Sequence, residues 1–394
     1  MRYETVMCKL SHFSNLVRKM KYYIITGEAS GDLHASNLMK ELKIQDPEAE
    51  FRFWGGDLML AQGGELVKHY RETAFMGFLT VVKNLGKIKA NFTLCEKDLL
   101  EFQPDVLILV DYPGFNLRMA KFAKKHGIRV HYYISPKIWA WKESRVKKIK
   151  AYVDRMFTIF PFETEFYRKH NFEVSFGGNP LLDALGNRPN KEEGFPDFIK
   201  RNELSEKPII ALLAGSRKQE IERVLPVMLE CVESFPDHQF VVAAAPSIDA
   251  EFYATVVGNQ KVQFVYGQTY ELLQQAQAAI VTSGTATLET ALLRIPQVVC
   301  YLTGGGKLLF TIGKRLLKVK YISLVNLIMD QLIVKELIQH TCNKEMITQE
   351  LNQILFNKEY RSQMLYNYQL LNEKLGGAGA SARFAKMIYE DLQK

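Results

Sequence analysis

The chain has few of the residues from which metal centres and disulfide frameworks are built. Its five cysteines stand at positions 8, 95, 231, 300 and 342, and the nearest two are 42 positions apart. No CxxC or zinc-finger spacing exists, and the eight histidines are scattered without an HExxH pattern. The composition therefore argues against a metal centre of His and Cys, and unpaired thiols favour a reducing compartment.

Long apolar runs are also absent. No stretch of about 18 apolar residues occurs, so we expect no transmembrane helix. Residues 1–19 lack the continuous apolar run of a signal peptide, which makes the cytoplasm the expected location. They carry no motif, and we expect this N-terminal extension to be dispensable. Glycine and proline together number only 38 of 394 residues, which excludes collagen-like or low-complexity character.

The charge balance is moderately basic, with a formal net charge of +8 and a pI of about 9.0. This excess permits an anionic partner, such as nucleic acid, a phosphorylated ligand or an acidic membrane face, without choosing among them. No RRM, KH or helix-turn-helix signature accompanies the basic residues, which disfavours nucleic acid.

Continuous apolar segments alternate with amphipathic ones along the chain. Continuous rather than alternating strands are typical of a parallel sheet covered on both faces, so the order indicates a doubly wound α/β fold. The predicted strands of the first half are 20–26, 50–54, 105–110, 129–134 and 155–160, with a helix over 32–42. Those of the second half are 208–214, 239–244, 262–265, 279–282 and 297–301.

This rhythm divides the chain into domains. The polar segment 186–207, which contains two Pro and two Gly, reads as a linker. It separates a first α/β domain over 20–185 from a second over 208–343, and a helical C-terminal tail follows over 344–394. Ligands of such sheets bind at the carboxyl ends of the strands, so two facing halves predict a cleft between them.

The first predicted strand ends in a glycine-rich turn over 27–32, with the sequence GEASGD. Free N–H groups where the following helix starts favour an anion. The turn is neither GxGxxG nor a Walker loop, which disfavours a dinucleotide oxidoreductase and a P-loop enzyme. The purely structural alternative is a turn capped by Ser30 or Asp32.

Two further loops of the first half would reach the cleft. Asp111 comes directly after a buried strand, where it either points into the cleft or caps the helix that begins near Gly114 or Asn116. The segment 133–141 holds two of the three tryptophans, which could stack on a sugar or pack between helices.

The second half offers two strand–glycine–helix turns, at 215–217 and 283–285. Backbone N–H groups beside a guanidinium suit a pyrophosphate, although a capped helix with a surface arginine is the simpler alternative. Glu289 falls in the first turns of the second helix, where its carboxylate could bind a ribose diol without a metal.

Two tracts, 75–92 and 306–321, combine apolar residues with lysines such as Lys83, Lys87 and Lys89. Both read as helices with an apolar face and cationic flanks, the pattern of a helix at a membrane interface. Ordinary amphipathic packing with solvated lysines is the alternative.

These motifs together resemble the lipid-A-disaccharide synthase family. The blocks occur in the family's order over roughly 20–390: GEASGDLHA at 27–35, FMGF at 75–78, VDYPGFN at 110–116, YYISPKIWAW at 132–141, PFE at 161–163, LAGSR at 213–217, SGTATLE at 283–289 and YISLVNL at 321–327. The resemblance implies an inverting glycosyltransferase of family 19 with the GT-B fold. Such an enzyme joins UDP-2,3-diacylglucosamine to 2,3-diacylglucosamine 1-phosphate (lipid X), releasing UDP, on the cytoplasmic face of the inner membrane.

The resemblance also implies roles for individual residues, with no cofactor and no metal. The UDP group would be held by Gly215, Ser216, Arg217, Ser283, Gly284, Thr285, Glu289 and Asn326. The acceptor would lie against Glu28, Ser30, Gly31, Asp32, Ser135, Trp139 and Asn179. Asp111 would be the catalytic base, and anionic inner-membrane lipids would be partners. C-terminal elements exchange between subunits in some members, so a homodimer is conceivable.

The chain departs from the family pattern at three positions. Ala214 and Val325 replace residues without removing a polar group, whereas Asn179 stands where many members have a histidine and cannot titrate. Within sugar chemistry the alternatives are a MurG-like transferase or a UDP-sugar epimerase, which lack the GEASGD and SPKIWAW blocks. A non-catalytic UDP-sugar-binding or membrane-docking protein is the alternative from another class.

Overall fold

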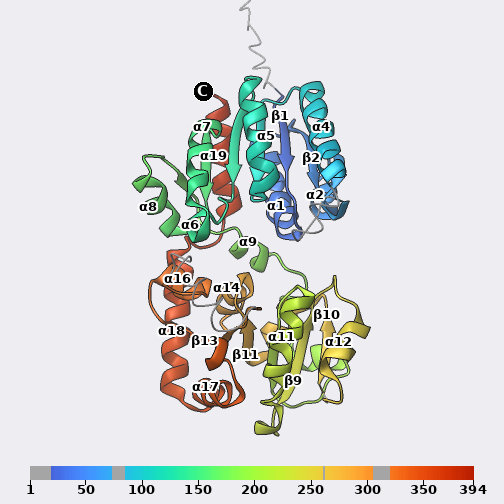
Figure 1. Cartoon of the computed structure of the whole chain (residues 1–394), viewed down its shortest axis with the longest axis vertical. Coiled ribbons are helices and arrows are strands. Elements are labelled where there is room, and N and C mark those ends of the chain that lie inside the picture. The colour runs from blue at the N-terminus through green and yellow to red at the C-terminus, as the bar shows by residue number, and fades with distance from the viewer. Residues whose placement is uncertain (1–18, 73–84, 261, 305–319) are drawn as a thin grey trace, which may run out of the picture.

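The computed structural model describes residues 19–72, 85–260, 262–304 and 320–394. These residues form two α/β domains, stacked along the long axis of the molecule in Figure 1. Each domain contains one parallel sheet.

The first domain has its strands in the spatial order β3-β2-β1-β4-β5-β6-β7. The strands are β1 (Lys21–Ile25), β2 (Glu50–Gly55), β3 (Glu65–His69), β4 (Val106–Val110), β5 (Arg129–Tyr133), β6 (Arg155–Thr158) and β7 (Ser175–Phe176). The helices are α1 (Ala29–Gln45), α2 (Asp57–Ala61), α4 (Leu85–Phe102), α5 (Pro113–Lys125), α6 (Ile138–Trp141), α7 (Val146–Tyr152) and α8 (Pro161–Lys169), with 3₁₀ turns η1 (Tyr70–Glu72) and η2 (Glu143–Arg145).

This sheet is buried on both faces because helices cover each of them. Alternate strand residues point to opposite sides and so pack against different helices. Tyr22 and Ile24 belong to the cluster that includes residues of α1, whereas Tyr23 and Ile25 pack with residues of α4, α5 and α7. Every residue of β4 is buried. The continuous apolar segments of the sequence therefore correspond to strands with helices on both sides.

The second domain repeats the order of the first, as β10-β9-β8-β11-β12-β13. Its strands are β8 (Ile209–Leu213), β9 (Gln239–Ala244), β10 (Gln263–Tyr266), β11 (Ala276–Thr282), β12 (Gln297–Tyr301) and β13 (Lys335–Ile338). The remaining helices are α9 (Leu181–Gly186), α10 (Phe195–Arg201), α11 (Lys218–Leu229), α12 (Ala250–Val257), α13 (Thr269–Gln275), α14 (Thr285–Leu292), α16 (Leu324–Met329), α17 (Lys344–Phe356), α18 (Lys358–Lys374) and α19 (Ala380–Leu392), with η3 (Val232–Ser234) and η4 (Gln339–Thr341).

The C-terminal tail does not stay with the second domain. α17 and α18 cover that domain, but α19 crosses back and lies beside α1 on the first, as the red helix in the upper half of Figure 1 shows. Asp391 near its end bonds Nε of Arg155 at 2.8 Å and Nε2 of His131 at 3.1 Å. These bonds lower the pKa of the Asp391 carboxyl. The two domains are thus joined twice, near α9 and at the start of α19.

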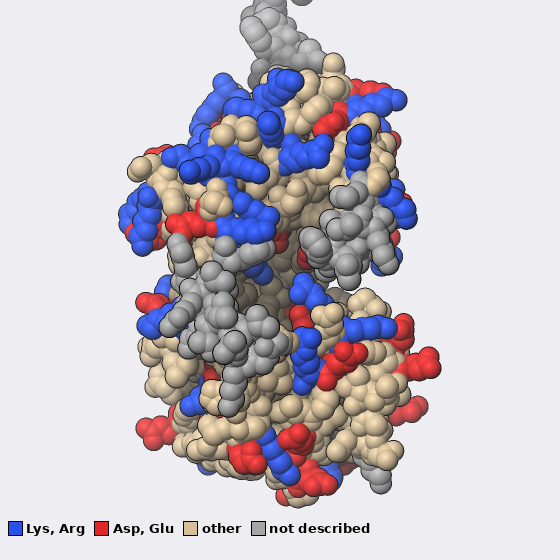
Figure 2. All heavy atoms as spheres, in the orientation of Figure 1, with Lys and Arg blue, Asp and Glu red and all other residues tan. Residues whose placement is uncertain are grey.

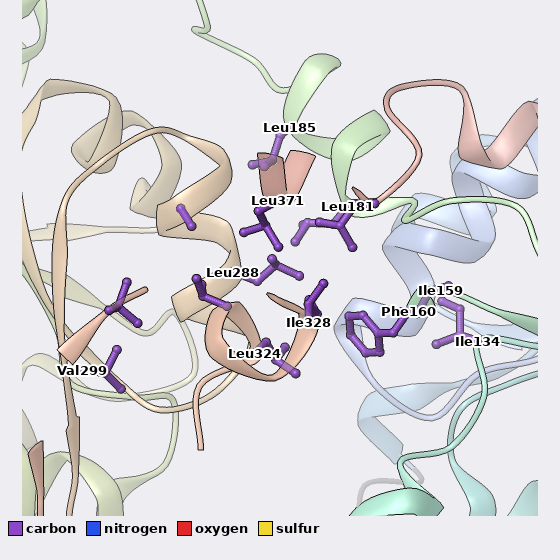
Figure 3. Packing of buried hydrophobic residues seen from close by; sticks show 14 of the residues in the cluster. Ile134, Ile159, Phe160, Leu181, Leu185, Leu288, Val299, Leu324, Ile328 and Leu371 are labelled. Atoms are coloured by element: carbon purple, nitrogen blue, oxygen red, sulfur yellow. The ribbon is translucent and has the colours of Figure 1, made fainter. Parts of the chain in front are cut away.

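The junction is tied by polar and apolar contacts. Asp183 of α9 accepts hydrogen bonds from the N–H groups of Gly379 and Ser381 at 2.6 and 2.7 Å. Arg383 donates to the carbonyls of Gly177 and Gly376 at 2.6 and 2.9 Å. Figure 3 shows the buried hydrophobic cluster that continues across this region, from Ile134, Ile159 and Phe160 of the first domain to Leu288, Leu324, Ile328 and Leu371 of the second.

The fold confirms the predicted α/β class and the ten predicted strands, with bounds that differ by up to three residues. Three strands were not predicted: β3, β7 and β13. All three lie at sheet edges, where half-exposed strands lack continuous apolar runs, and β7 spans only two residues. The expected linker over 186–207 contains α10, because Phe198 is fully buried against the second sheet.

Candidate active site

Four loops meet where the strand order of each sheet reverses direction. β1 and β4 are neighbours at the centre of the first sheet, and β8 and β11 at the centre of the second. The crevice outside the carboxyl ends of such strands is where ligands of open α/β sheets bind. A cavity of about 510 Å³ between the domains is lined by residues that follow all four strands. They are Glu28, Ser30, Asp111, Lys137, Leu213, Gly215, Ser216, Arg217, Glu220, Ala243, Ala245, Pro246, Thr269, Thr282, Ser283, Gly284, Thr285, Ala286 and Glu289.

Asp111 enters this cavity on a strained turn. Asp111 and Tyr112 both have positive φ angles, of 41° and 45°, a conformation that is costly for residues other than glycine. The carbonyl oxygen of Asp111 accepts hydrogen bonds from Oη of Tyr132 at 2.5 Å and Nδ2 of Asn116 at 2.8 Å. α5 begins at Pro113 with Tyr112 as its N-cap and without a side-chain cap. The helix-capping alternative for Asp111 is therefore wrong.

The electrostatic surroundings of Asp111 suit proton transfer. Burial raises the pKa of its carboxyl to about 6, an effect opposed chiefly by the charge of Lys137 and increased by Glu28. A carboxylate with a pKa close to neutrality is ionised at pH 7 yet basic enough to accept a proton. Lys137 and Glu28 both line the same cavity.

The glycine-rich turn after β1 packs directly against the Asp111 turn. A Cβ on Gly27 would lie 2.4 Å from the ring of Tyr112, so only glycine allows this approach. α1 begins at Ala29 with Glu28 as its N-cap and no side-chain cap, so neither Ser30 nor Asp32 caps it. Glu28 and Ser30 remain exposed toward the cavity.

The facing domain presents mainly turns and helix starts. Gly215 has a φ of 110° and a Cβ there would lie 2.7 Å from Oε2 of Glu220, so this turn requires glycine. Arg217 is the N-cap of α11, and its exposed guanidinium lies 3.3 Å from Oε1 of Glu220. Gly284 is the N-cap of α14. Two helix starts beside an arginine form a place where a polyphosphate can bind.

Glu289, one turn into α14, completes this side. Burial raises the pKa of its carboxyl, while the hydrogen bond from Oη of Tyr270, at 3.3 Å, lowers it. The carboxylate still lines the cavity. Thr282, which lines the same cavity, has a buried hydroxyl without a hydrogen-bond partner among the described residues. Both side chains can accept hydrogen bonds from a ligand.

Comparison with known proteins identifies this arrangement. A family model described as lipid-A-disaccharide synthetase matches residues 22–385. The lipid-A-disaccharide synthase of Trichlorobacter lovleyi is 36% identical over 383 residues, which cover 96% of this chain and 99% of that protein. That of Geobacter metallireducens is 37% identical over 377 residues, covering 94% and 97%. The chain belongs to the lipid-A-disaccharide synthase family. It is a glycosyltransferase of lipid A biosynthesis, as the sequence resemblance implied.

Solved structures confirm the fold at low sequence identity. A putative UDP-N-acetylglucosamine 2-epimerase from Listeria monocytogenes superposes with a TM-score of 0.66 at 14% identity, covering 95% of this chain and 97% of that one. A glycotransferase of kitacinnamycin gives a TM-score of 0.64 at 15% identity, with 95% and 100% covered. The chain therefore has the two-domain GT-B fold, which it shares with this epimerase and this glycotransferase.

The structure brings ten of the expected site residues to one cavity. They are Glu28, Ser30, Asp111, Gly215, Ser216, Arg217, Ser283, Gly284, Thr285 and Glu289. These ten residues share one location, and the roles that the family resemblance implies for them stay predictions.

The six others do not line that cavity, and each is hydrogen-bonded or packed elsewhere. Asp32 accepts bonds from the N–H groups of Gly56, Leu58 and Met59, and so holds the start of α2. A Cβ on Gly31 would lie 3.0 Å from Cβ of Thr26.

Ser135 and Trp139 support the segment that carries Lys137. Oγ of Ser135 lies 2.8 Å from Oη of Tyr167, and Nε1 of Trp139 donates to Glu163 at 3.2 Å. Burial raises the pKa of Glu163 to about 7, and its Oε2 also accepts from the N–H of Phe160.

Asn179 is buried in the segment between β7 and α9, and Asn326 is buried within α16. Asn179 donates to the carbonyl of Ile159 at 3.3 Å, and its N–H bonds the carbonyl of Leu375 at the junction. The side-chain oxygen of Asn326 accepts from the N–H groups of Ile333 and Val334 at 2.7 and 3.0 Å.

Sequence reasoning missed Lys137, Glu220 and Thr282 as cavity residues. Lys137 lies inside the SPKIWAW block, and its charge beside a predicted cleft aspartate was the available signal. Glu220 and Thr282 flank predicted turns, but nothing in their spacing separates them from helix and strand residues.

The two basic apolar tracts are only partly described. Residues 75–84 of one and 306–319 of the other lie outside the described residues. Lys87 and Lys89 are exposed on α4, which agrees with both interpretations of the tract. Among the described helices, none is long and apolar enough to cross a membrane. Among all the residues that the structure describes, no group of three or more His, Cys, Asp or Glu side chains is arranged to hold a metal ion.

Proposed function

We propose that this chain transfers 2,3-diacylglucosamine from its UDP derivative to the 6-hydroxyl of 2,3-diacylglucosamine 1-phosphate (lipid X), with inversion at the anomeric carbon. The observation that carries the proposal is that the Asp111 carboxyl shares one cavity with both glycine turns of the second domain. A base on one side and a polyphosphate site on the other are what a sugar transfer across a cleft requires.

Asp111 acts as the general base in this proposal. Its carboxylate takes the proton of the acceptor hydroxyl while that oxygen forms a bond to the anomeric carbon. The bond from that carbon to UDP breaks, and its electron pair leaves on the phosphate oxygen. The hydrogen bonds of Asn116 and Tyr132 hold the strained turn, which keeps the carboxyl aimed at the cleft.

The second domain stabilises the leaving group. Arg217 and the N-terminal ends of α11 and α14 place positive charge where the diphosphate develops negative charge. Glu289 accepts two hydrogen bonds from the ribose diol, which fixes the nucleotide without a metal. Ser283 supports this turn by donating to the carbonyl of Ile322 at 3.1 Å.

The same proposal places the protein on anionic lipid at the inner face of the inner membrane. Its support is the cationic flanks of tract 75–92, of which Lys87 and Lys89 are exposed. Homodimer formation stays a prediction from the family resemblance.

The deciding experiment incubates the purified chain with UDP-2,3-diacylglucosamine and lipid X, and measures UDP release and disaccharide formation. The proposal requires both products in equal amounts and none without lipid X. An epimerase would instead interconvert the UDP-sugar without an acceptor, and a binding protein would release no UDP.

A further inference from the structure

A second groove begins beside the Asp111 turn and runs along the outer face of the first domain, between α5 and α7. Its volume is about 340 Å³. The residues that line it are Pro113, Gly114, Leu117, Arg118, Lys121, Arg145, Lys148 and Tyr152. Because Pro113 is two residues past Asp111, one end of this α5–α7 groove adjoins the candidate base.

The charge of this region is almost entirely of one sign. Residues 113–153 contain eleven Lys and Arg and a single acidic residue, Glu143. Figure 2 shows Lys and Arg side chains gathered over the domain that carries α5 and α7, whereas both signs are interspersed over the other domain. Four of the eleven cations line the α5–α7 groove, and no carboxylate is among the described residues that line it.

The four cations surround an apolar floor. Leu117 is buried and Tyr152 is half-buried, and Pro113 lies at the end nearest the cleft. Arg118 is held in place by stacking on the ring of Phe92, with 3.9 Å between its guanidinium carbon and the ring centroid. A preorganised guanidinium loses less freedom when it binds an anion.

Arg145 connects the groove to the catalytic carboxyl. It is half-buried at the end of η2, directly before α7. Its charge is close enough to Asp111 to lower the pKa of that carboxyl. A ligand that contacts both Asp111 and Arg145 must present a hydroxyl and an anion near one another.

A hexose 1-phosphate meets this requirement. Its 6-hydroxymethyl group and its phosphate are attached to the two carbons that flank the ring oxygen. When the 6-hydroxyl contacts the base, the phosphate therefore lies less than the width of one sugar ring farther on. Arginine and lysine are the residues that bind phosphate most strongly, by charge-assisted hydrogen bonds.

We propose that the end of the α5–α7 groove next to Asp111 is the subsite for the acceptor's phosphate monoester. Arg145 and Lys148 bind it from α7, and Arg118 and Lys121 supply positive charge from α5. The inference rests on the proposed transfer reaction and adds to it the group by which the acceptor is selected. Because UDP is held by the other domain, this subsite does not contribute to donor binding.

The test compares two acceptors, one with the 1-phosphate and one without it. Turnover is measured in neutral detergent micelles, so that no anionic lipid headgroups compete. The wild-type chain should use the phosphorylated acceptor with a kcat/KM roughly 10- to 100-fold higher, the size expected for one or two charge-assisted hydrogen bonds. Arg145→Gln and Lys148→Gln should each remove most of this preference, leaving the donor KM unchanged.

Lys147→Gln provides a matched control. Lys147 is adjacent to Lys148 and is also exposed, but it lines a different hollow, together with Val146, Lys150 and His170. The Lys147→Gln substitution removes the same charge as Lys148→Gln and should leave the acceptor preference at the wild-type value. Equal melting temperatures of the three variants would exclude unfolding as the cause.

Several outcomes would overturn the inference and leave the transfer reaction intact. One is equal use of the two acceptors by the wild type. Another is the same loss in Lys147→Gln as in Lys148→Gln, which would indicate a general field effect. A third is weaker binding of Arg145→Gln to vesicles of anionic phospholipid with unchanged acceptor preference, which would assign the groove to lipid headgroups. Absence of turnover with either acceptor would instead contradict the proposed function.

Discussion

The two sides of the cleft share one strand order but present different chemistry. In the first domain the loops after β1, β4 and β5 carry charged side chains to the cavity: Glu28, Asp111 and Lys137. In the second domain the loops after β8 and β11 present glycine turns and helix starts, and the charged groups of this side, Arg217, Glu220 and Glu289, lie on α11 and α14 or at their starts. The common topology provides the place for a ligand, and the loop residues decide whether that side does chemistry or holds a nucleotide.

The largest effect should come from Asp111→Asn, which keeps the size of the side chain but removes the base. Loss of a general base typically costs 10²- to 10⁴-fold, so kcat should fall by about that factor. Glu28→Gln removes a carboxylate from the same cavity and should cost much less. If Asp111→Asn keeps a near wild-type kcat, Asp111 is not the base.

A smaller effect, and on a different quantity, is expected from Glu289→Gln. The ribose contact exists in both ground and transition states, so the variant should bind UDP more weakly with little change in kcat. Loss of one or two charge-assisted hydrogen bonds corresponds to about 1.5–3 kcal/mol. Calorimetric titration with UDP measures this, and unchanged affinity would remove Glu289 from the nucleotide site.

The pH dependence of kcat/KM should show that the first domain supplies the base. Since the Asp111 carboxyl must be ionised, kcat/KM should fall about tenfold per pH unit below a pKa of about 6. Lys137→Gln should move this acid limb to higher pH, because the lysine charge lowers the pKa, and Glu28→Gln should move it to lower pH. Movement in the same direction in both variants, or in neither, would contradict the assignment.

Membrane binding should depend on the first domain's tract 75–92. Replacing Lys83, Lys87 and Lys89 with Ser should weaken binding to anionic vesicles more than it lowers the melting temperature. Wild-type binding should also weaken as salt rises, since charge attraction is screened. Equal binding to neutral and anionic vesicles would speak against an electrostatic contact.

The smallest effect is expected from shortening the chain to begin at Met20, directly before β1. Activity and melting temperature should both remain at the full-length values. A clear decrease in either would mean that residues 1–19 pack against the body.

How far the sequence predicted this molecule depends on the kind of interaction. The central strands and the four cleft loops were predictable because burial on both faces produces continuous apolar runs, and because ligand loops follow the strands. Asp111 was placed correctly beyond β4, but its exclusion as a helix cap required the positive φ angles of the turn. The return of α19 to the first domain depends on Asp391 meeting Arg155 and His131, contacts that span more than 230 residues.

The site residues show the same limit. Asp32, Asn179 and Asn326 are polar residues within motifs, and the sequence cannot distinguish a ligand contact from a bond to buried backbone N–H groups. In the structure, Asp32 and Asn326 bond the backbone of α2 and of residues 333–334. Lys137 was missed for the opposite reason, because a lysine in a loop is usually solvated.

The most direct test of the division between the two sides measures kcat and the UDP dissociation constant together for Asp111→Asn and Glu289→Gln. We predict a crossed result: Asp111→Asn loses kcat and keeps UDP affinity, whereas Glu289→Gln loses UDP affinity and nearly keeps kcat. If both variants change both quantities in parallel, the two domains do not divide catalysis and nucleotide binding between them.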